Sequence, residues 1–289
     1  MKKILFASTA LILSAGVASA NDNISFAGDA RMGVVYSSAT SPNAQFAARA
    51  RMTIRMERTT DTGLTVGATF RVDNAGDAAM NMMTDGSVYI SGDFGRLTMG
   101  NIAGAAEGAT GNLPNIGFSE LRQGVQWLSN AGTNRTSARY EYSFDGFTVM
   151  LSSDQLGSQG SGRQYMGIGV QYTFDGFTVG LGHEQGRIGG GTDRHTIASV
   201  EAALDMVTLK AVYGQRNNEF GVTTDQWGLS ASANIDAVNV TAYYMKRLDA
   251  SRNYGLGASY SLGGGAHLRG AVNRSGTTTT ADFGITMSF

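Results

Sequence analysis

The end of the chain carries a strict alternation of large apolar residues with small or polar ones. In an extended strand, this period of two places every large apolar side chain on one face. Here the apolar members are Phe283, Ile285, Met287 and Phe289. An apolar face backed by a polar one suits a barrel strand that has lipid outside and water inside.

The same alternation recurs along most of the sequence. Residues 46–58, for example, place Phe46 and Met52 on one phase and Arg49 and Arg51 on the other. Few segments look helical, so the pattern predicts a sheet with one apolar and one wet face. We expect sixteen strands, near 24–35, 46–59, 63–73, 86–92, 95–101, 134–144, 147–153, 163–174, 177–185, 194–204, 207–216, 225–235, 238–247, 253–262, 266–274 and 280–289.

Tight turns divide these strands into hairpins. Asp145-Gly146 and Asp175-Gly176 each lie between alternating apolar residues, and Asp-Gly is a strong signal for a two-residue hairpin turn. An even strand number closes the sheet and removes its edges. The predicted fold is therefore an all-β, transmembrane antiparallel barrel. Aromatic residues beside the short turns predict an interfacial girdle of Phe94, Phe144, Phe147, Phe174, Phe177 and Phe289.

The amino terminus has the features of a secretory signal peptide over residues 1–20. Lys2 and Lys3 precede a short apolar run, and Ala18-Ser19-Ala20 is a small-residue cleavage motif. The mature barrel domain would span 21–289. Loss of the two lysines would move the formal net charge from −1 to −3, which argues against a nucleic-acid partner. The chain has no cysteine, so disulfides and thiolate metal sites are excluded.

These features together resemble the general porins of Gram-negative bacteria, particularly the sixteen-stranded alphaproteobacterial kind. The resemblance rests on the signal peptide, the first strand from Ile24, the run 94–101 (FGRLTMGN) and the terminal Phe289. It implies a homotrimer in the outer-membrane lipid, with a water-filled pore in each subunit. It also implies a third loop that folds inward to narrow the pore.

The segment 102–133, here called the long loop, matches that third loop in position. It is far longer than its neighbours, and such insertions are usually functional or disordered. It carries Glu107 and Glu120, and Ser119 before Glu120 could begin a helical turn. Its apolar residues would pack an inward-folded loop against the barrel wall; they are Leu121, Val125, Trp127 and Leu128.

Arginines gather on the water-facing phase of the early strands. They are Arg31, Arg49, Arg51, Arg55 and Arg71. Facing carboxylates from the long loop, they would create a transverse field across a narrow pore, and rings of charge set ion preference. We therefore predict a constriction formed by these five arginines with Glu107 and Glu120. The simpler alternative is that the arginines are ordinary solvated residues on a wet wall.

Catalytic and cofactor signals are weak. His183, His195 and His267 lie on separate hairpins without a nucleophile elbow. No cofactor is expected, although the loop carboxylates of Asp73, Asp77 and Asp85 leave a calcium site open. The leading hypothesis is an outer-membrane channel for passive diffusion of ions and small hydrophilic solutes. A substrate-specific channel, a barrel enzyme of the lipase or protease type, and a secreted soluble β-protein are the alternatives. Anion or cation preference stays undetermined.

Overall fold

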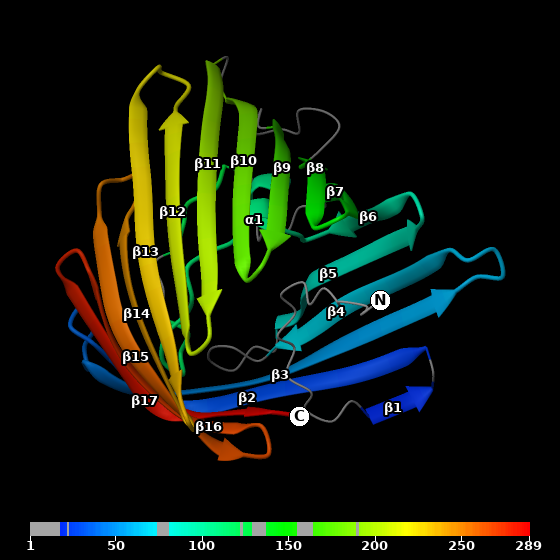
Figure 1. Cartoon of the computed structure of the whole chain (residues 1–289). Coiled ribbons are helices and arrows are strands. Elements are labelled where there is room, and N and C mark those ends of the chain that lie inside the picture. Colours follow the sequence, from blue (N-terminus) through cyan, green and yellow to red (C-terminus); the bar gives the residue numbers. More distant parts are fainter. Residues whose placement is uncertain are drawn as a thin grey trace.

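The fold is one antiparallel sheet rolled into a barrel (Figure 1). The computed structural model describes residues 18–21, 23–73, 81–121, 124–128, 137–154, 164–188 and 191–289. Its strands are β1 (Ala18–Asn21), β2 (Ile24–Ser37), β3 (Ala44–Thr59), β4 (Thr65–Asp73), β5 (Asn81–Gly92), β6 (Gly95–Gly100), β7 (Ser137–Phe144), β8 (Phe147–Ser153), β9 (Gln164–Phe174), β10 (Phe177–Ile188), β11 (Gly191–Leu204), β12 (Val207–Asn217), β13 (Thr223–Ile235), β14 (Val238–Lys246), β15 (Arg252–Gly263), β16 (Ala266–Ser275) and β17 (Thr278–Ser288).

Each strand from β2 to β17 pairs with its sequence neighbours, and β17 pairs with β2 to close the ring. At the seam, Phe289 exchanges two backbone hydrogen bonds with Gly28. The sixteen-stranded prediction is therefore confirmed, and the terminal strand closes the barrel. The extra strand β1 continues along β2 beside Ile24–Phe26, where β17 has already ended.

Most of the predicted signal peptide, residues 1–17, lies outside the described residues. The predicted cleavage after Ala20 would remove all of β1 except Asn21. Processing at that position stays a prediction.

The hairpin turns follow the chemistry expected of them. Asp145 and Gly146 have φ values of 44° and 80°, and Asp175 and Gly176 have 43° and 83°. Such left-handed pairs match the twist of the flanking strands. The neighbouring aromatic rings form one stacked series on the outer surface. It runs through Tyr142, Phe144, Phe147, Tyr172, Phe174 and Phe177.

The two faces of the wall differ as the alternation predicted. Outward apolar side chains such as Leu181, Leu256 and Phe283 are 56%, 57% and 61% exposed. Inward residues of the same strands, such as Glu184 and Asp282, are buried under the long loop. The outer face thus presents an apolar band to its surroundings, while the packed core lies inside the barrel.

A short helix, α1 (Ala105–Thr110), lies inside the barrel against β8, β9, β10 and β11 (Figure 1). The expectation of a helical turn beginning at Ser119 is wrong, since residues 117–120 form a non-helical turn and Glu120 has a φ of 62°. Among the described residues, no helix is long and apolar enough to cross a membrane.

Candidate functional site: a charged cluster facing the long loop

Strand register brings the arginines of β2, β3 and β4 together on the inner face. Asp29 on β2 lies opposite Arg51 on β3, and Arg51 lies opposite Asp73 on β4. Arg49 Nη2 lies 2.8 Å from Asp29 Oδ1, and Arg51 Nε lies 2.9 Å from Asp73 Oδ2. Arg71 Nε lies 3.7 Å from the same Asp73 oxygen. A ladder of alternating charge therefore runs across three adjacent strands.

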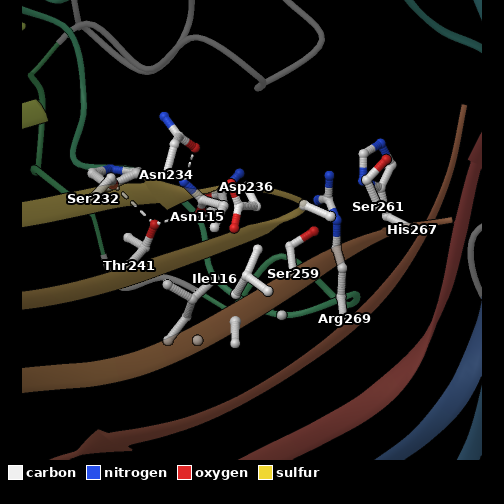
Figure 2. A pocket seen from close by; sticks show the side chains of 17 residues that line it. Asn115, Ile116, Ser232, Asn234, Asp236, Thr241, Ser259, Ser261, His267 and Arg269 are labelled. Carbon is white, nitrogen blue, oxygen red and sulfur yellow. Dashed lines mark hydrogen bonds between the residues drawn. The ribbon is translucent and has the colours of Figure 1, made fainter. Parts of the chain in front are cut away.

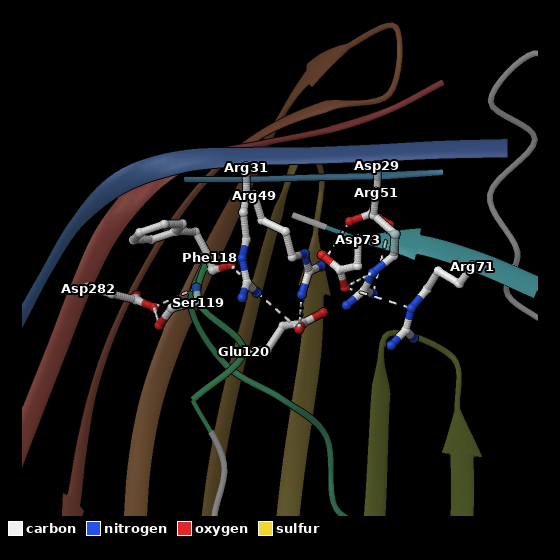
Figure 3. A network of polar contacts seen from close by, with 10 residues as sticks. All are labelled: Asp29, Arg31, Arg49, Arg51, Arg71, Asp73, Phe118, Ser119, Glu120 and Asp282. Carbon is white, nitrogen blue, oxygen red and sulfur yellow. Dashed lines mark hydrogen bonds and ion pairs between the residues drawn. The ribbon is translucent and has the colours of Figure 1, made fainter. Parts of the chain in front are cut away.

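One pair of neighbouring arginines is stabilised by a residue from a distant part of the chain. Arg31 and Arg49 lie directly opposite each other on β2 and β3, and like charges in that position repel. Glu120 from the long loop lies between them, and its Oε2 is 3.0 Å from both guanidinium groups (Figure 3). The carboxylate thus compensates the repulsion and fixes the tip of the loop against this wall.

The surroundings of Glu120 keep it ionised. Burial alone would raise the pKa of its carboxyl group, but the hydrogen bond from Arg49 and the positive charges of Arg49, Arg31 and Arg51 outweigh burial. The pKa of Glu120 therefore lies below its usual value. We name Arg31, Arg49, Arg51 and Arg71 with Asp29, Asp73 and Glu120 the charged cluster. Its four cations exceed its three anions by one.

The residues before Glu120 are anchored to the closing seam of the barrel. The backbone N–H of Ser119 donates to Asp282 Oδ2 at 2.8 Å, and its hydroxyl donates to the same oxygen at 2.5 Å. Phe118 is fully buried against Gly33 and Gly284, where any Cβ would lie 2.9 Å from its ring. The alternation of the terminal strand puts Asp282 on the polar face, opposite to Phe283, but no sequence pattern predicts this anchoring role.

The opposite wall holds the start of the long loop by close backbone approach. A Cβ at Gly169 or Gly180 would lie 2.2 Å from a carbonyl oxygen of α1, and one at Gly182 would lie 2.6 Å from Ala106. Those inward glycines create the space in which the helix lies. The facing side chains of Ala105 and Ala106 are fully buried.

The return segment, residues 124–128, is fixed by hydrogen bonds from its backbone to buried side chains of the wall. Gln226 is fully buried; its Oε1 accepts from the N–H of Gln126 and its Nε2 donates to the same residue's carbonyl, both at 2.9 Å. Leu128 N–H donates to Glu184 Oε2 at 2.9 Å. The expected packing of the loop's apolar residues is confirmed, with Val125 and Leu128 buried and Leu121 and Trp127 packed on the same core.

Not every predicted site residue joins the charged cluster. Arg55 shares its strand face but has no ion pair within 4.0 Å among the described residues. Glu107 lies on α1, near the far wall, where its Oε1 accepts a hydrogen bond from Asn112 at 3.3 Å. Glu120 is therefore the loop carboxylate that joins the charged cluster, through Arg31 and Arg49.

The remaining sequence hypotheses concern calcium and catalysis. Asp73 pairs with arginines, whereas Asp77 and the side chain of Asp85 lie outside the described residues. No group of three or more metal-ligating side chains occurs in the described part of the chain. His195 lies under the loop beside Gln226 and Glu184, while His183 on the next strand points to the other face and contacts Thr196.

Comparisons with known proteins agree with this geometry. The model of the Gram-negative porin family matches residues 7–280. The chain belongs to the Gram-negative porin family. A porin from Rhodobacter capsulatus is 30% identical over 308 residues, covering 92% of this chain and 100% of that protein.

Solved porin structures share the fold. One porin structure is 28% identical and superposes with a TM-score of 0.79, covering 92% of this chain and 100% of that one. A variant of the Rhodopseudomonas blastica porin is 22% identical, with a TM-score of 0.73 and the same coverage. This porin is a channel-forming barrel rather than an enzyme, so the lipase or protease alternative is not supported.

Proposed function

We propose that this porin lies in the outer membrane as a homotrimer and allows passive diffusion of ions and small hydrophilic solutes. The observation that supports the proposal is the position of the long loop, which lies inside a barrel whose outer face is apolar. The charged cluster, which includes Glu120 of the long loop, would form the constriction. The homotrimer is proposed on family membership alone.

The charged cluster would select solutes by their response to a fixed local field. Its cations extend from the wall, and Glu120 faces them from the loop. Groups held in fixed positions cost little reorganisation as a solute passes. An apolar solute would have to displace water that is ordered between these charges without replacing its hydrogen bonds.

Conductance in planar bilayers tests the channel directly. Purified, folded protein should produce steady, ohmic steps in potassium chloride. The detergent-extracted assembly should run as a trimer in analytical ultracentrifugation, and a folded protein without conductance would contradict the proposal.

Conduction should need no bound cofactor. Addition of a calcium chelator is expected to leave the step size unchanged, because the constriction is made of side-chain charges. A loss of conductance that calcium restores would instead establish a calcium site in the loops.

A further inference from the structure

A second polar region lies inside the barrel, beside the charged cluster, because His267 of β16 and Arg31 of β2 both lie opposite Thr286 of β17. It is a recess of about 470 Å³ between residues 114–117 of the long loop and the inner faces of β13 to β16 (Figure 2). The short turn at Asp236 and Ala237 lines it, so it lies at the end of the barrel that carries the short turns. Ile116 packs onto β15 at Gly257 and forms part of its lining.

One corner of the recess, on β16, holds the cation Arg269 with the imidazole of His267 beside it. Arg269 and His267 share the inner face of that strand and both line the recess. Arg269 Nε is buried and has no hydrogen-bond partner. Among the described residues, no carboxylate lies within ion-pair distance of Arg269, whereas Arg49 and Arg51 each pair with carboxylates. Glu120 acts on Arg269 electrostatically from the charged cluster, but it forms its ion pairs with Arg31 and Arg49. The corner therefore keeps a positive charge for an incoming anion.

The wall beside this corner is rich in amides and hydroxyls. A chain of hydrogen bonds fixes four of them: Ser232 contacts Thr241 at 2.9 Å, Thr241 donates to Asn239 at 3.1 Å, and Asn239 donates to Asn234 at 2.8 Å. Asn234 is the last member of this chain, and its Nδ2 keeps its hydrogen-bond donors available. This arrangement holds polar groups in place before any solute arrives.

Two further hydroxyls and one carboxylate complete the lining. Ser259 and Ser261 lie on β15 opposite Arg269 and His267, and neither side chain has a hydrogen bond within the described structure. Asp236 also lines the recess. Its negative charge would repel a polyanion but accept hydrogen bonds from hydroxyl groups. The lining therefore combines one site for negative charge with several for hydroxyls.

We propose that this recess is a binding subsite for hydroxylated monoanions of the sugar-acid class. The carboxylate of the solute would bind Arg269, with His267 beside it. Its hydroxyls would bind Ser259, Ser261 and the amides of β13 and β14. This proposal rests on the proposed function, because the solute would reach the recess from the pore.

Blockade of single channels by potassium gluconate tests the subsite. Pentanoate, which lacks the hydroxyls, and sorbitol, which lacks the charge, are the comparison probes. Gluconate should block more strongly than either probe. Blockade should also be stronger when gluconate is added from one side of the bilayer. Replacement Arg269→Gln should raise the half-blocking gluconate concentration about tenfold, as expected for loss of a charge-assisted hydrogen bond.

Arg274→Gln is the matched control, because Arg274 lies on the same strand but in the opposite phase. It should leave blockade unchanged. Equal blockade by pentanoate or sorbitol, or an unaltered half-blocking concentration in Arg269→Gln, would overturn the subsite.

If Arg269→Gln does not fold, the double replacement Ser259→Ala and Ser261→Ala tests the subsite instead. It should weaken blockade by gluconate and not by pentanoate, and no change would contradict the proposal. Step size in potassium chloride without gluconate tests channel formation separately.

Discussion

The long loop is held by two walls of the barrel that work in different ways. On β8 to β13, α1 and the return segment are fixed by glycine contacts and by hydrogen bonds to the buried side chains of Gln226 and Glu184. On β2 to β4, the loop tip is fixed by Glu120 between two arginines, with 42% of the carboxylate side chain exposed. One wall provides position and the other provides charge.

This difference separates stability from selectivity. Close packing is short-ranged, so a single added methyl group on the packed wall should move the loop. Ion pairs beside water contribute less to stability, but their charges act on passing ions over several ångströms. The two walls can therefore be perturbed independently.

The largest expected effect is on the packed wall. Replacement Gly182→Ala would place a Cβ 2.6 Å from Ala106, so α1 must shift. Overpacking of this kind typically costs about 1–3 kcal/mol. We expect a lower unfolding temperature in detergent together with an altered channel step size.

Gly86→Ala is the matched control, because its Cβ would meet nothing closer than 3.7 Å. Equal effects of the two replacements would show that the close approach of α1 does not hold the loop.

A smaller effect is expected on the charged wall. In Arg49→Gln with Arg51→Gln, two positive charges about 8 Å from a passing ion are lost, a change of about 1 kcal/mol in water or about fivefold in local ion concentration. Cation permeability relative to anion permeability should rise by up to that factor. Reversal potentials under a salt gradient measure this change, with Arg274→Gln as the control on the opposite face. An unchanged potential would remove the charged cluster from the selectivity mechanism.

Acidification should produce a still smaller change. The pKa of Glu120 is lowered, so its ion pairs persist at neutral pH and are lost only as the pH falls below the ordinary value of about 4.3. Protonation removes one negative charge, which should shift selectivity toward anions by about twofold. Glu120→Gln should already show this shift at neutral pH and remain flat across that range. A wild-type transition near neutral pH would point to another group.

The smallest expected effect is that of ionic strength, which should act differently on the two walls. Raising salt from about 0.1 M to about 1 M shortens the screening length from about 10 Å to about 3 Å. The difference between wild type and the double arginine variant should shrink, whereas the destabilisation by Gly182→Ala should stay constant. A salt-dependent glycine effect would show that charge also holds the packed wall.

Local patterns in the sequence were enough to predict the barrel. Alternation with a period of two fixes which side chains share a face, and Asp145-Gly146 fixes a hairpin because left-handed φ values are required there. Strand count, the closing role of the terminal strand and the inward phase of Arg49 follow from these local rules. Extra strand β1 did not follow, because its alignment beside β2 depends on where β17 ends.

The partners of the site residues were determined only by the tertiary structure. Glu107 and Glu120 look alike in sequence. Among the described residues, Glu120 pairs with Arg31 and Arg49, whereas Glu107 lies away from them because glycines on β9 and β10 hold α1 at the far wall. The anchors Asp282 and Gln226 lie 163 and 100 positions along the chain from their partners in the loop. In the sequence, each anchor is visible only as one polar residue on an inward phase. Many other residues share that property. Sequence alone therefore determined the barrel and its wet face, whereas the partners of the charged residues depended on how the long loop packs inside it.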